Sequence, residues 1–182
     1  MKKNIIPSWK DVYLLVFDFD GVFTNNKVLV NNKGDEYIIC SRGDGLAFDL
    51  LRQFINLKKW EIEYFILSRE ENKVVDERSK KLKIPCFSGV KNKKKFIEEY
   101  IVNRNLNLNS KSKKFVYVGN DLNDLSCILI SDFSIVPKDS HKIVRDEADL
   151  IIDRNGGDDF VRQIVELLLR IDDMEVDDIV KL

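Results

Sequence analysis

The sequence contains few of the residues that build disulfide frameworks or zinc sites. Its three cysteines, Cys40, Cys86 and Cys127, are odd in number and include no CxxC pair, so neither a disulfide framework nor a zinc site is indicated. The single histidine, His141, argues against a histidine-built transition-metal site and is expected to have a structural role. Reduced cysteines are typical of a reducing compartment, so we expect a cytoplasmic protein.

Long hydrophobic segments and a net charge are absent as well. No stretch of the chain approaches about eighteen uninterrupted apolar residues, and residues 1–7 have no apolar core of signal length, so we expect neither a membrane span nor a leader. Thirty basic and 31 acidic residues leave a formal net charge of −1, which gives no reason to expect nucleic acid as a partner.

The composition that is present suits a single soluble domain. The 182 residues are 44% hydrophobic and 34% charged, and a chain of this length buries enough surface to fold without disulfides or metals. We predict one domain over residues 1–182, with its core at about residues 11–171 and a loosely held acidic tail at residues 172–182.

Short apolar runs recur along the chain, and each stops at polar residues. The first, residues 12–17, ends at Asp18 and is apolar throughout, as expected for a strand buried on both faces. Similar runs lie at residues 62–67, 115–118, 133–136 and 150–152. Helix-length segments alternate with them at residues 44–57, 92–103, 122–130 and 160–171. The alternation predicts an α/β fold with a three-layer, Rossmann-like parallel sheet.

One segment interrupts this alternation. Residues 27–40 contain two predicted strands about a turn at residues 31–34, which indicates a small β-hairpin directly after the first acidic pair. We find no segment long enough to form a separate cap domain.

Two clusters of oxygen-bearing side chains follow predicted strands. Asp18 and Asp20 come directly after the first strand, and carboxylates so close repel each other unless a cation or a shared proton holds them. Asn120 and Asp121 follow the strand at residues 115–118, which a parallel sheet would bring beside the first. Such oxygens suit a hard cation such as Mg²⁺. Helix capping is the alternative role, and we expect it for one member of the second cluster.

Four ordered motifs resemble those of the haloacid dehalogenase-like phosphohydrolases. They are residues 18–24, Ser68 after its strand, Lys93 within residues 89–93, and residues 119–124. Further features resemble one capless branch of this family. That branch contains the 3-deoxy-manno-octulosonate 8-phosphate phosphatases and the phosphatase-like domains associated with acylneuraminate cytidylyltransferases. The features are the hairpin, residues 41–45, Arg78 and residues 155–157. The resemblance covers residues 11–171.

The resemblance implies an Mg²⁺-dependent phosphatase. Asp18 would attack phosphorus and form an aspartyl-phosphate, and the Asp18 carboxylate and the backbone carbonyl of Asp20 would bind the metal. Asp20 would also protonate the leaving oxygen and later activate water. Ser68 and Lys93 would stabilise the transferring phosphoryl group, with Lys91 as the alternative to Lys93.

The third metal ligand is left open by the sequence, because the family usually has an aspartate at the position of Asn120. Either Asn120 is the direct ligand and Asp121 supplies charge behind it, or Asp121 binds the metal itself. Asp124 would orient Lys93 or bound water.

The expected substrate is a 2-keto-3-deoxy sugar acid phosphate, either 3-deoxy-D-manno-octulosonate 8-phosphate or an N-acylneuraminate 9-phosphate. An arginine would bind its carboxylate bidentately, with ordinary surface ion pairs as the alternative role for the arginines. The expected substrate-binding residues are Arg42, Asp44, Gly45, Arg69 and Arg78.

The branch resemblance also implies a homotetramer in which a neighbouring subunit completes each active site. A non-catalytic assembly or sugar-sensing module of a nucleotide-sugar pathway is the alternative function, although loss of the aspartate pair or the lysine would have favoured it and both are present. A sugar phosphomutase would share the aspartyl-phosphate but usually needs an enclosing cap domain.

Overall fold

A computed structural model describes residues 5–106 and 114–182; residues 1–4 and 107–113, which the single-domain prediction included, lie outside the described residues. Within the described part, the central element is a six-stranded parallel sheet in the order β5-β4-β1-β6-β7-β8. The strands are β1 (Val12–Phe17), β4 (Glu63–Leu67), β5 (Cys86–Phe87), β6 (Lys114–Val118), β7 (Phe133–Pro137) and β8 (Leu150–Ile152). The predicted α/β fold is confirmed.

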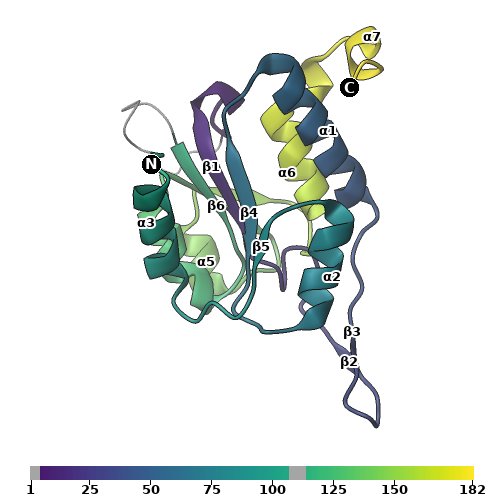
Figure 1. Ribbon diagram of the computed structural model, residues 1–182, viewed down its shortest axis with the longest axis vertical. Coiled ribbons are helices and arrows are strands. Elements are labelled where there is room, and N and C mark those ends of the chain that lie inside the picture. Colours follow the sequence, from purple (N-terminus) through teal and green to yellow (C-terminus); the bar gives the residue numbers. More distant parts are fainter. Residues whose placement is uncertain (1–4, 107–113) are drawn as a thin grey trace.

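Helices cover both faces of the sheet (Figure 1). On one side lie α1 (Gly43–Lys58), α2 (Lys73–Leu82) and α6 (Phe160–Leu169), and on the other α3 (Lys93–Asn103), α4 (Leu125–Ile130) and α5 (Lys142–Glu147). Strand β1 shows how the two layers form: Leu15 and Phe17 pack into the first, and Leu14 and Val16 into the second. Because both faces are covered, the strand is apolar throughout.

Several elements differ from the sequence prediction. Helix α6 ends at Leu169, two residues earlier than predicted, where Arg170 adopts a left-handed conformation with φ 59°. Helix α2 was not predicted, because Val75, Ser79 and Leu82 alone of its residues are buried and give a weak apolar period. Strand β5 and helix α5 were also missed. The predicted helix at residues 122–130 is a 3₁₀ turn, η2 (Leu122–Asp124), followed by α4.

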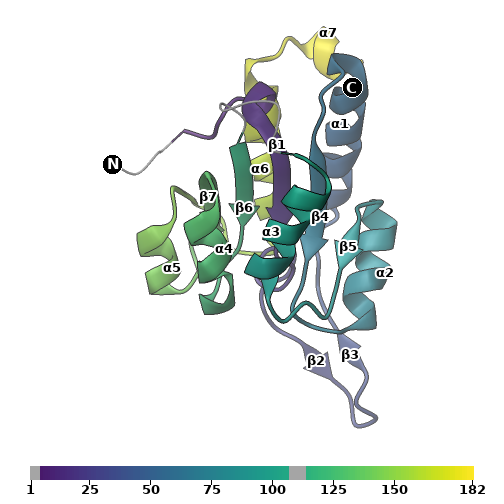
Figure 2. The same ribbon diagram turned by 60° about the vertical axis from the view of Figure 1, so that its left-hand side comes forward.

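The hairpin is confirmed, with shorter paired strands than residues 27–40. Strands β2 (Leu29–Val30) and β3 (Glu36–Tyr37) pair antiparallel, and a bridge between Thr24 and Cys40 closes the base. The hairpin projects beyond the rest of the domain at the end of the sheet near α2 (Figures 1 and 2).

Both end segments of the described chain pack on the α1–α6 side of the sheet. The 3₁₀ turn η1 (Trp9–Asp11) places the Trp9 ring 5.0 Å from that of Phe54. After α6, η3 (Ile171–Asp173) and α7 (Val176–Ile179) carry the chain to Leu182, which is buried against the same core cluster. Within residues 5–106 and 114–182, no helix combines the length and apolarity needed to cross a bilayer.

Candidate active site

The site forms at the carboxyl ends of three neighbouring strands. Asp18 directly follows β1, Ser68 follows β4, and Asn120 lies two residues after β6, with β1 paired to both of the other strands. The Asp18 amide donates to the carbonyl of Val118 at 2.8 Å, which continues the sheet into the site. All three polar residues line a cavity of about 370 Å³. Ligands of open parallel sheets bind at this edge.

Lys93 enters this site from the first turn of α3. Its Nζ lies 2.6 Å from Oδ1 of Asp18 and 2.8 Å from Oδ1 of Asp124, and its side chain is 2% exposed. The side chain of Asn92 caps the helix by accepting from the amide of Lys95, which sets where α3 begins. Lys91, the alternative site lysine, is exposed.

Four donors surround the carboxylate of Asp124. Its Oδ1 accepts from Lys93 and from the Tyr117 hydroxyl at 2.6 Å, and its Oδ2 accepts from the amides of Asn120 at 2.9 Å and Asp121 at 3.3 Å. Asp121 in turn caps η2 by accepting from the amide of Leu122 at 2.7 Å. The capping role expected for one member of this cluster therefore belongs to Asp121.

The buried charges of this network are not balanced. Burial and the nearby Asp124 raise the pKa of Asp18 to about 8, although Lys93 acts in the opposite direction. Burial alone would also raise the pKa of Asp124, but Lys93 and the hydrogen bonds around Asp124 hold it below its usual value. When both carboxylates are ionised, the single ammonium between them leaves one negative charge without compensation. A second cation would therefore favour the ionised form of Asp18.

Asn120 supplies an oxygen that fits such a cation. Its Oδ1 is buried and has no hydrogen-bond partner among the described residues. The amide lies over Gly21, where an added Cβ would come within 1.8 Å of Asn120 Nδ2, so the turn after Asp20 requires glycine there. The described residues contain no group of three or more His, Cys, Asp or Glu side chains arranged to hold a metal. The oxygens available at this edge, the Asp18 carboxylate and the Asn120 amide among them, are of the kind that a hard divalent cation prefers.

Asp20 and Ser68 face the same cavity. Burial, together with Glu70 and Glu36, raises the pKa of Asp20, which favours its protonated form. Ser68 is buried, and its Oγ accepts from the amide of Glu70 at 3.2 Å. The serine hydroxyl can still donate its own hydrogen to a ligand.

The predicted substrate-binding residues divide into two groups. Arg69 lines the cavity, but the remaining four are not among its lining residues within one chain. Arg42 is exposed at the start of α1, Gly45 lies on that helix, and Asp44 is buried in its first turn. Arg78 on α2 donates through Nη2 to the carbonyl of Ser41 at 2.5 Å. Their roles in substrate binding stay predictions.

The hairpin contributes cavity residues that the sequence analysis did not assign. The side chain of Asn72, which caps α2, donates to the Glu36 carboxylate and so ties the hairpin to that helix. The position of the hairpin soon after Asp20 in the sequence was the one signal that could have indicated hairpin residues in the cavity. The unassigned cavity residues with polar side chains are Asn26, Glu36, Glu70, Asn72 and Asn123.

Residues 155–157 support the loop that carries the two aspartates. The Gly157 amide donates to the carbonyl of Val22 at 3.0 Å. An added Cβ on Gly156 would lie 1.9 Å from the carbonyl oxygen of Gly21, so only glycine permits this approach of the two backbones.

The comparisons with known proteins agree with this architecture. No family model matches the chain. Among solved structures, a chain described as a HAD family hydrolase from Streptomyces avermitilis MA-4680 is 32% identical, with a TM-score of 0.80 over 93% of this chain and 97% of that one. This chain belongs to the HAD family, the haloacid dehalogenase-like hydrolases.

Curated relatives of the chain include phosphatases. The 3-deoxy-D-manno-octulosonate 8-phosphate phosphatase KdsC of Escherichia coli K12 is 26% identical over 167 residues, which are 91% of this chain and 84% of that protein. A crystal structure of the phosphatase of the same name from Moraxella catarrhalis, in complex with magnesium ion, phosphate ion and KDO, is 25% identical with a TM-score of 0.76 and covers 89% of this chain and 88% of that one. The HAD protein described here is thus a phosphatase, and the non-catalytic alternative is not supported.

Proposed function

We propose that this HAD phosphatase hydrolyses a sugar acid phosphate through an aspartyl-phosphate on Asp18. The observation that carries the proposal is the 2.6 Å contact between Lys93 Nζ and Asp18 Oδ1 beside a cavity of about 370 Å³. A buried carboxylate paired with an ammonium at the edge of a cavity is positioned to receive an anionic phosphoryl group without meeting unscreened repulsion.

The reaction consists of two displacements. In the first, the Asp18 carboxylate attacks phosphorus, the bond from phosphorus to the sugar oxygen breaks, and Asp20 gives that oxygen its proton. In the second, Asp20 takes a proton from water, whose oxygen attacks phosphorus and releases inorganic phosphate and Asp18. The raised pKa of Asp20 supports its starting role as an acid, because burial favours the protonated carboxyl group.

Ser68 and Lys93 would stabilise the phosphoryl group during both displacements. The Ser68 hydroxyl can donate to one phosphoryl oxygen, and the Lys93 ammonium offsets the negative charge that Asp18 and the phosphate bring together. Both side chains are buried, so their interactions act in surroundings where water screens them little.

Mg²⁺ is the cofactor that we propose. The Asp18 carboxylate, the backbone carbonyl of Asp20 and the amide oxygen of Asn120 would hold it, with Asp121 as the alternative to Asn120. When bound, the ion supplies positive charge to the nucleophile and the phosphoryl oxygens. The buried, unpartnered Oδ1 of Asn120 supports this choice, as does the raised pKa of Asp18, whose ionised form a bound cation would favour. The magnesium ion in the Moraxella catarrhalis phosphatase supports it as well.

The proposed substrate is 3-deoxy-D-manno-octulosonate 8-phosphate or an N-acylneuraminate 9-phosphate. The relatives named as 3-deoxy-D-manno-octulosonate 8-phosphate phosphatases support the first of these. Such a substrate carries a carboxylate as well as a phosphate, whereas Asp20, Glu36 and Glu70 give the cavity an acidic lining around Arg69. Further positive charge is needed, and we propose that a neighbouring subunit supplies part of it.

A homotetramer built through the hairpins is the assembly that we propose. Five apolar residues of the hairpin segment are 50–68% exposed: Val28, Leu29, Val30, Tyr37 and Ile39. A two-stranded hairpin is marginally stable alone in water, and its free edges invite pairing with another chain. Because Val28 and Ile38 also line the cavity, a partner bound to the hairpin would lie beside the active site.

The proposed setting is lipopolysaccharide or sialic acid biosynthesis in the cytoplasm. The proposed substrate class, and the relatives named as 3-deoxy-D-manno-octulosonate 8-phosphate phosphatases, support this setting. The compartment is supported by Cys40, Cys86 and Cys127, which are all free thiols, as is usual in reducing surroundings.

Measuring phosphate release from both sugar acid phosphates, with Mg²⁺ and with a chelator, tests this function. We expect turnover that requires Mg²⁺ and is abolished in Asp18→Asn, because an amide cannot act as the nucleophile. Asp49→Asn, which alters an exposed aspartate on α1, is the matched control and should keep wild-type turnover. Undiminished turnover in Asp18→Asn would exclude the nucleophile assignment, and a wild-type protein inactive on both substrates would exclude the substrate class.

A further inference from the structure

Tyr117 belongs to the buried charge network but takes no part in the chemistry proposed above. It lies on β6, one of the two strands beside β1, and is 0% exposed. Its hydroxyl donates to Oδ1 of Asp124 at 2.6 Å. A hydroxyl directed at a carboxylate in the core makes a charge-assisted hydrogen bond, which is stronger than one between neutral groups.

The two oxygens of Asp124 have different partners, and this difference gives Tyr117 its effect. Oδ2 is held by the amides of Asn120 and Asp121, which the main chain positions. Oδ1 is shared by the Tyr117 hydroxyl and the Lys93 ammonium. Tyr117 therefore competes with Lys93 for the charge on one oxygen atom.

Lys93 is likewise shared, between Asp124 at 2.8 Å and Asp18 at 2.6 Å. A hydrogen bond that reduces the negative charge on Oδ1 of Asp124 weakens the attraction between Asp124 and the Lys93 ammonium. The ammonium then interacts more strongly with Asp18 and with a phosphoryl group bound there. If the Tyr117 hydroxyl is removed, Oδ1 keeps Lys93 as its side-chain donor and draws the ammonium away from the nucleophile.

We propose that Tyr117 is a positioning residue for phosphoryl transfer: its hydrogen bond to Asp124 directs the Lys93 ammonium toward Asp18 and the transferring group. The inference rests on the proposed function. It assigns a role in transition-state stabilisation to a side chain that touches neither the substrate nor the nucleophile.

The test is Tyr117→Phe, which removes the hydroxyl and keeps the ring. We expect kcat to fall about tenfold while KM stays within about twofold, because the interaction acts mainly in the transition state. Inhibition by vanadate, which mimics the transferring phosphoryl group, should weaken by about the same factor as kcat, and inhibition by inorganic phosphate by no more than about twofold.

Each negative result would contradict a different claim. An inactive wild-type enzyme would contradict the proposed function itself. An active wild-type enzyme with an unchanged kcat in Tyr117→Phe would overturn the role of Tyr117 alone. Equal weakening of vanadate and phosphate inhibition would also overturn it, since a general loosening of the site would affect both ligands.

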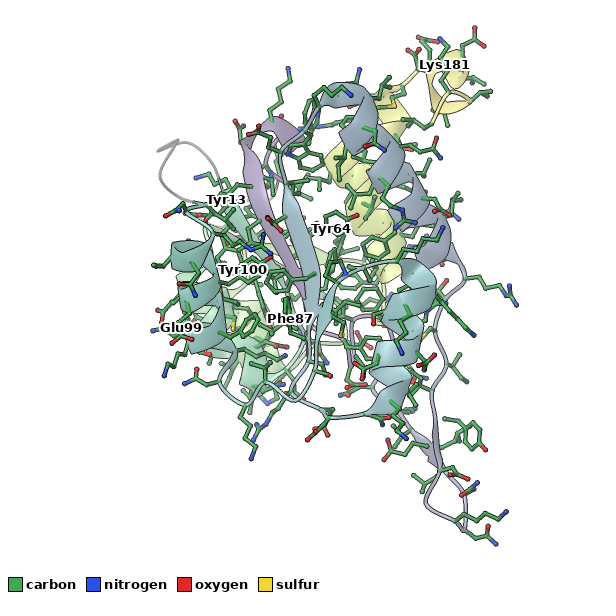
Figure 3. All side chains as sticks on the ribbon, in the orientation of Figure 1. Tyr13, Tyr64, Phe87, Glu99, Tyr100 and Lys181 are labelled. Carbon is green, nitrogen blue, oxygen red and sulfur yellow. The ribbon has the colours of Figure 1, made fainter. Side chains whose placement is uncertain are left out.

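Tyr100→Phe is the matched control. The Tyr100 hydroxyl also donates to a carboxylate, Oε2 of Glu63 at 3.0 Å. Tyr100 lies on α3 (Figure 3), and it is not a residue of the cavity lining. We expect Tyr100→Phe to leave kcat unchanged. A comparable fall in both variants would overturn the specific role of Tyr117.

A double-mutant cycle tests whether Tyr117 acts through Asp124. In an Asp124→Asn background the charge that Tyr117 shares with Lys93 is gone, so adding Tyr117→Phe should change kcat by less than about twofold. The assay uses enough enzyme to follow slow turnover. The same tenfold loss in both backgrounds would exclude action through Asp124. If Tyr117→Phe alone does not fold, Asp124→Asn and the double variant still test the proposal, because a tenfold difference in kcat between these two would exclude action through Asp124.

Discussion

The ammonium of Lys93 lies 2.6 Å from a carboxylate oxygen of Asp18, although 75 residues separate the two in the sequence. The contact joins the end of β1 to the start of α3, and Asp124 completes it from the segment after β6. Three parts of the chain thus meet in one buried charge network.

Removing the ammonium should affect both activity and stability. We expect Lys93→Ala to lower kcat by about 10²- to 10³-fold, because the phosphoryl group bound at Asp18 loses the ammonium that offsets its charge. The free energy of unfolding should fall by about 3 kcal/mol, since Asp18 and Asp124 remain buried without their partner. Phosphate release and urea unfolding measure the two effects. Lys91→Ala, two residues away and exposed, is the control and should change stability by less than about 0.5 kcal/mol; similar losses in both variants would contradict the assignment.

Two substitutions distinguish the candidates for the third metal ligand. We expect Asn120→Ala to weaken Mg²⁺ binding by about tenfold or more and Asp121→Asn to weaken it less, because the buried oxygen of Asn120 lacks a partner whereas Asp121 caps η2. Calorimetric titration of the apoprotein with Mg²⁺ measures this directly. The reverse order of effects would assign the ligand to Asp121.

Asp44 should make stability depend on pH. Burial raises its pKa to about 7 from 3.8, with Asp159 adding to the shift and Arg78 opposing it. The folded state therefore holds this proton more tightly than the unfolded state, so the contribution of Asp44 is greatest below pH 4 and is lost as pH rises toward 7. Between pH 5 and pH 8 we expect the free energy of unfolding to fall by roughly 2 to 3 kcal/mol more in the wild type than in Asp44→Asn.

Urea unfolding at the two pH values measures this difference. Asp49→Asn, an exposed aspartate on the same helix, should retain the wild-type dependence. An Asp44→Asn protein with the same decline as the wild type would show that Asp44 is ionised in the folded state throughout this range.

The hairpin should control the oligomeric state. We expect Ile39→Asp to reduce the molar mass in solution, because a charge on this 68% exposed apolar side chain opposes its burial between subunits. Val102→Asp on α3, where the side chain is 65% exposed, should leave the mass unchanged. Light scattering coupled to size exclusion measures both. A wild-type monomer at micromolar concentration, or an equal effect of both substitutions, would contradict the hairpin assembly.

Local patterns in the sequence were sufficient for much of the fold. The apolar run at residues 12–17 predicted a strand with the observed bounds, because a strand covered on both faces needs an apolar residue at every position. The segment at residues 150–152 also matched in its bounds, although β8 is an edge strand in which Ile151 is 42% exposed. Helix α2 and strand β5 were not predicted from the sequence, because their apolar patterns are weak or short. Contacts with the rest of the domain hold them in place.

The resemblance to HAD phosphatases named Asp18, Ser68 and Lys93 as candidates from their order and strand-end positions. It could not separate Lys93 from Lys91, because which lysine points into the core depends on where the cap residue Asn92 starts α3. It also did not indicate that Tyr117, which reads as one more apolar position of a strand, donates to Asp124.

What the sequence by itself determined is the type and order of the elements, since periodicity and strand-end signals involve residues only a few positions apart. Tertiary structure decided which side chains meet. The pairing of β4, β1 and β6 brings Asp18 beside Asp124, and the packing of α3 on that sheet directs Lys93 between them. The hairpin is likewise tied to α2 and brings Glu36 to the cavity lining, to which Arg42 and Arg78 do not belong within one chain. Such contacts depend on register and packing over long sequence separations, which no local pattern records.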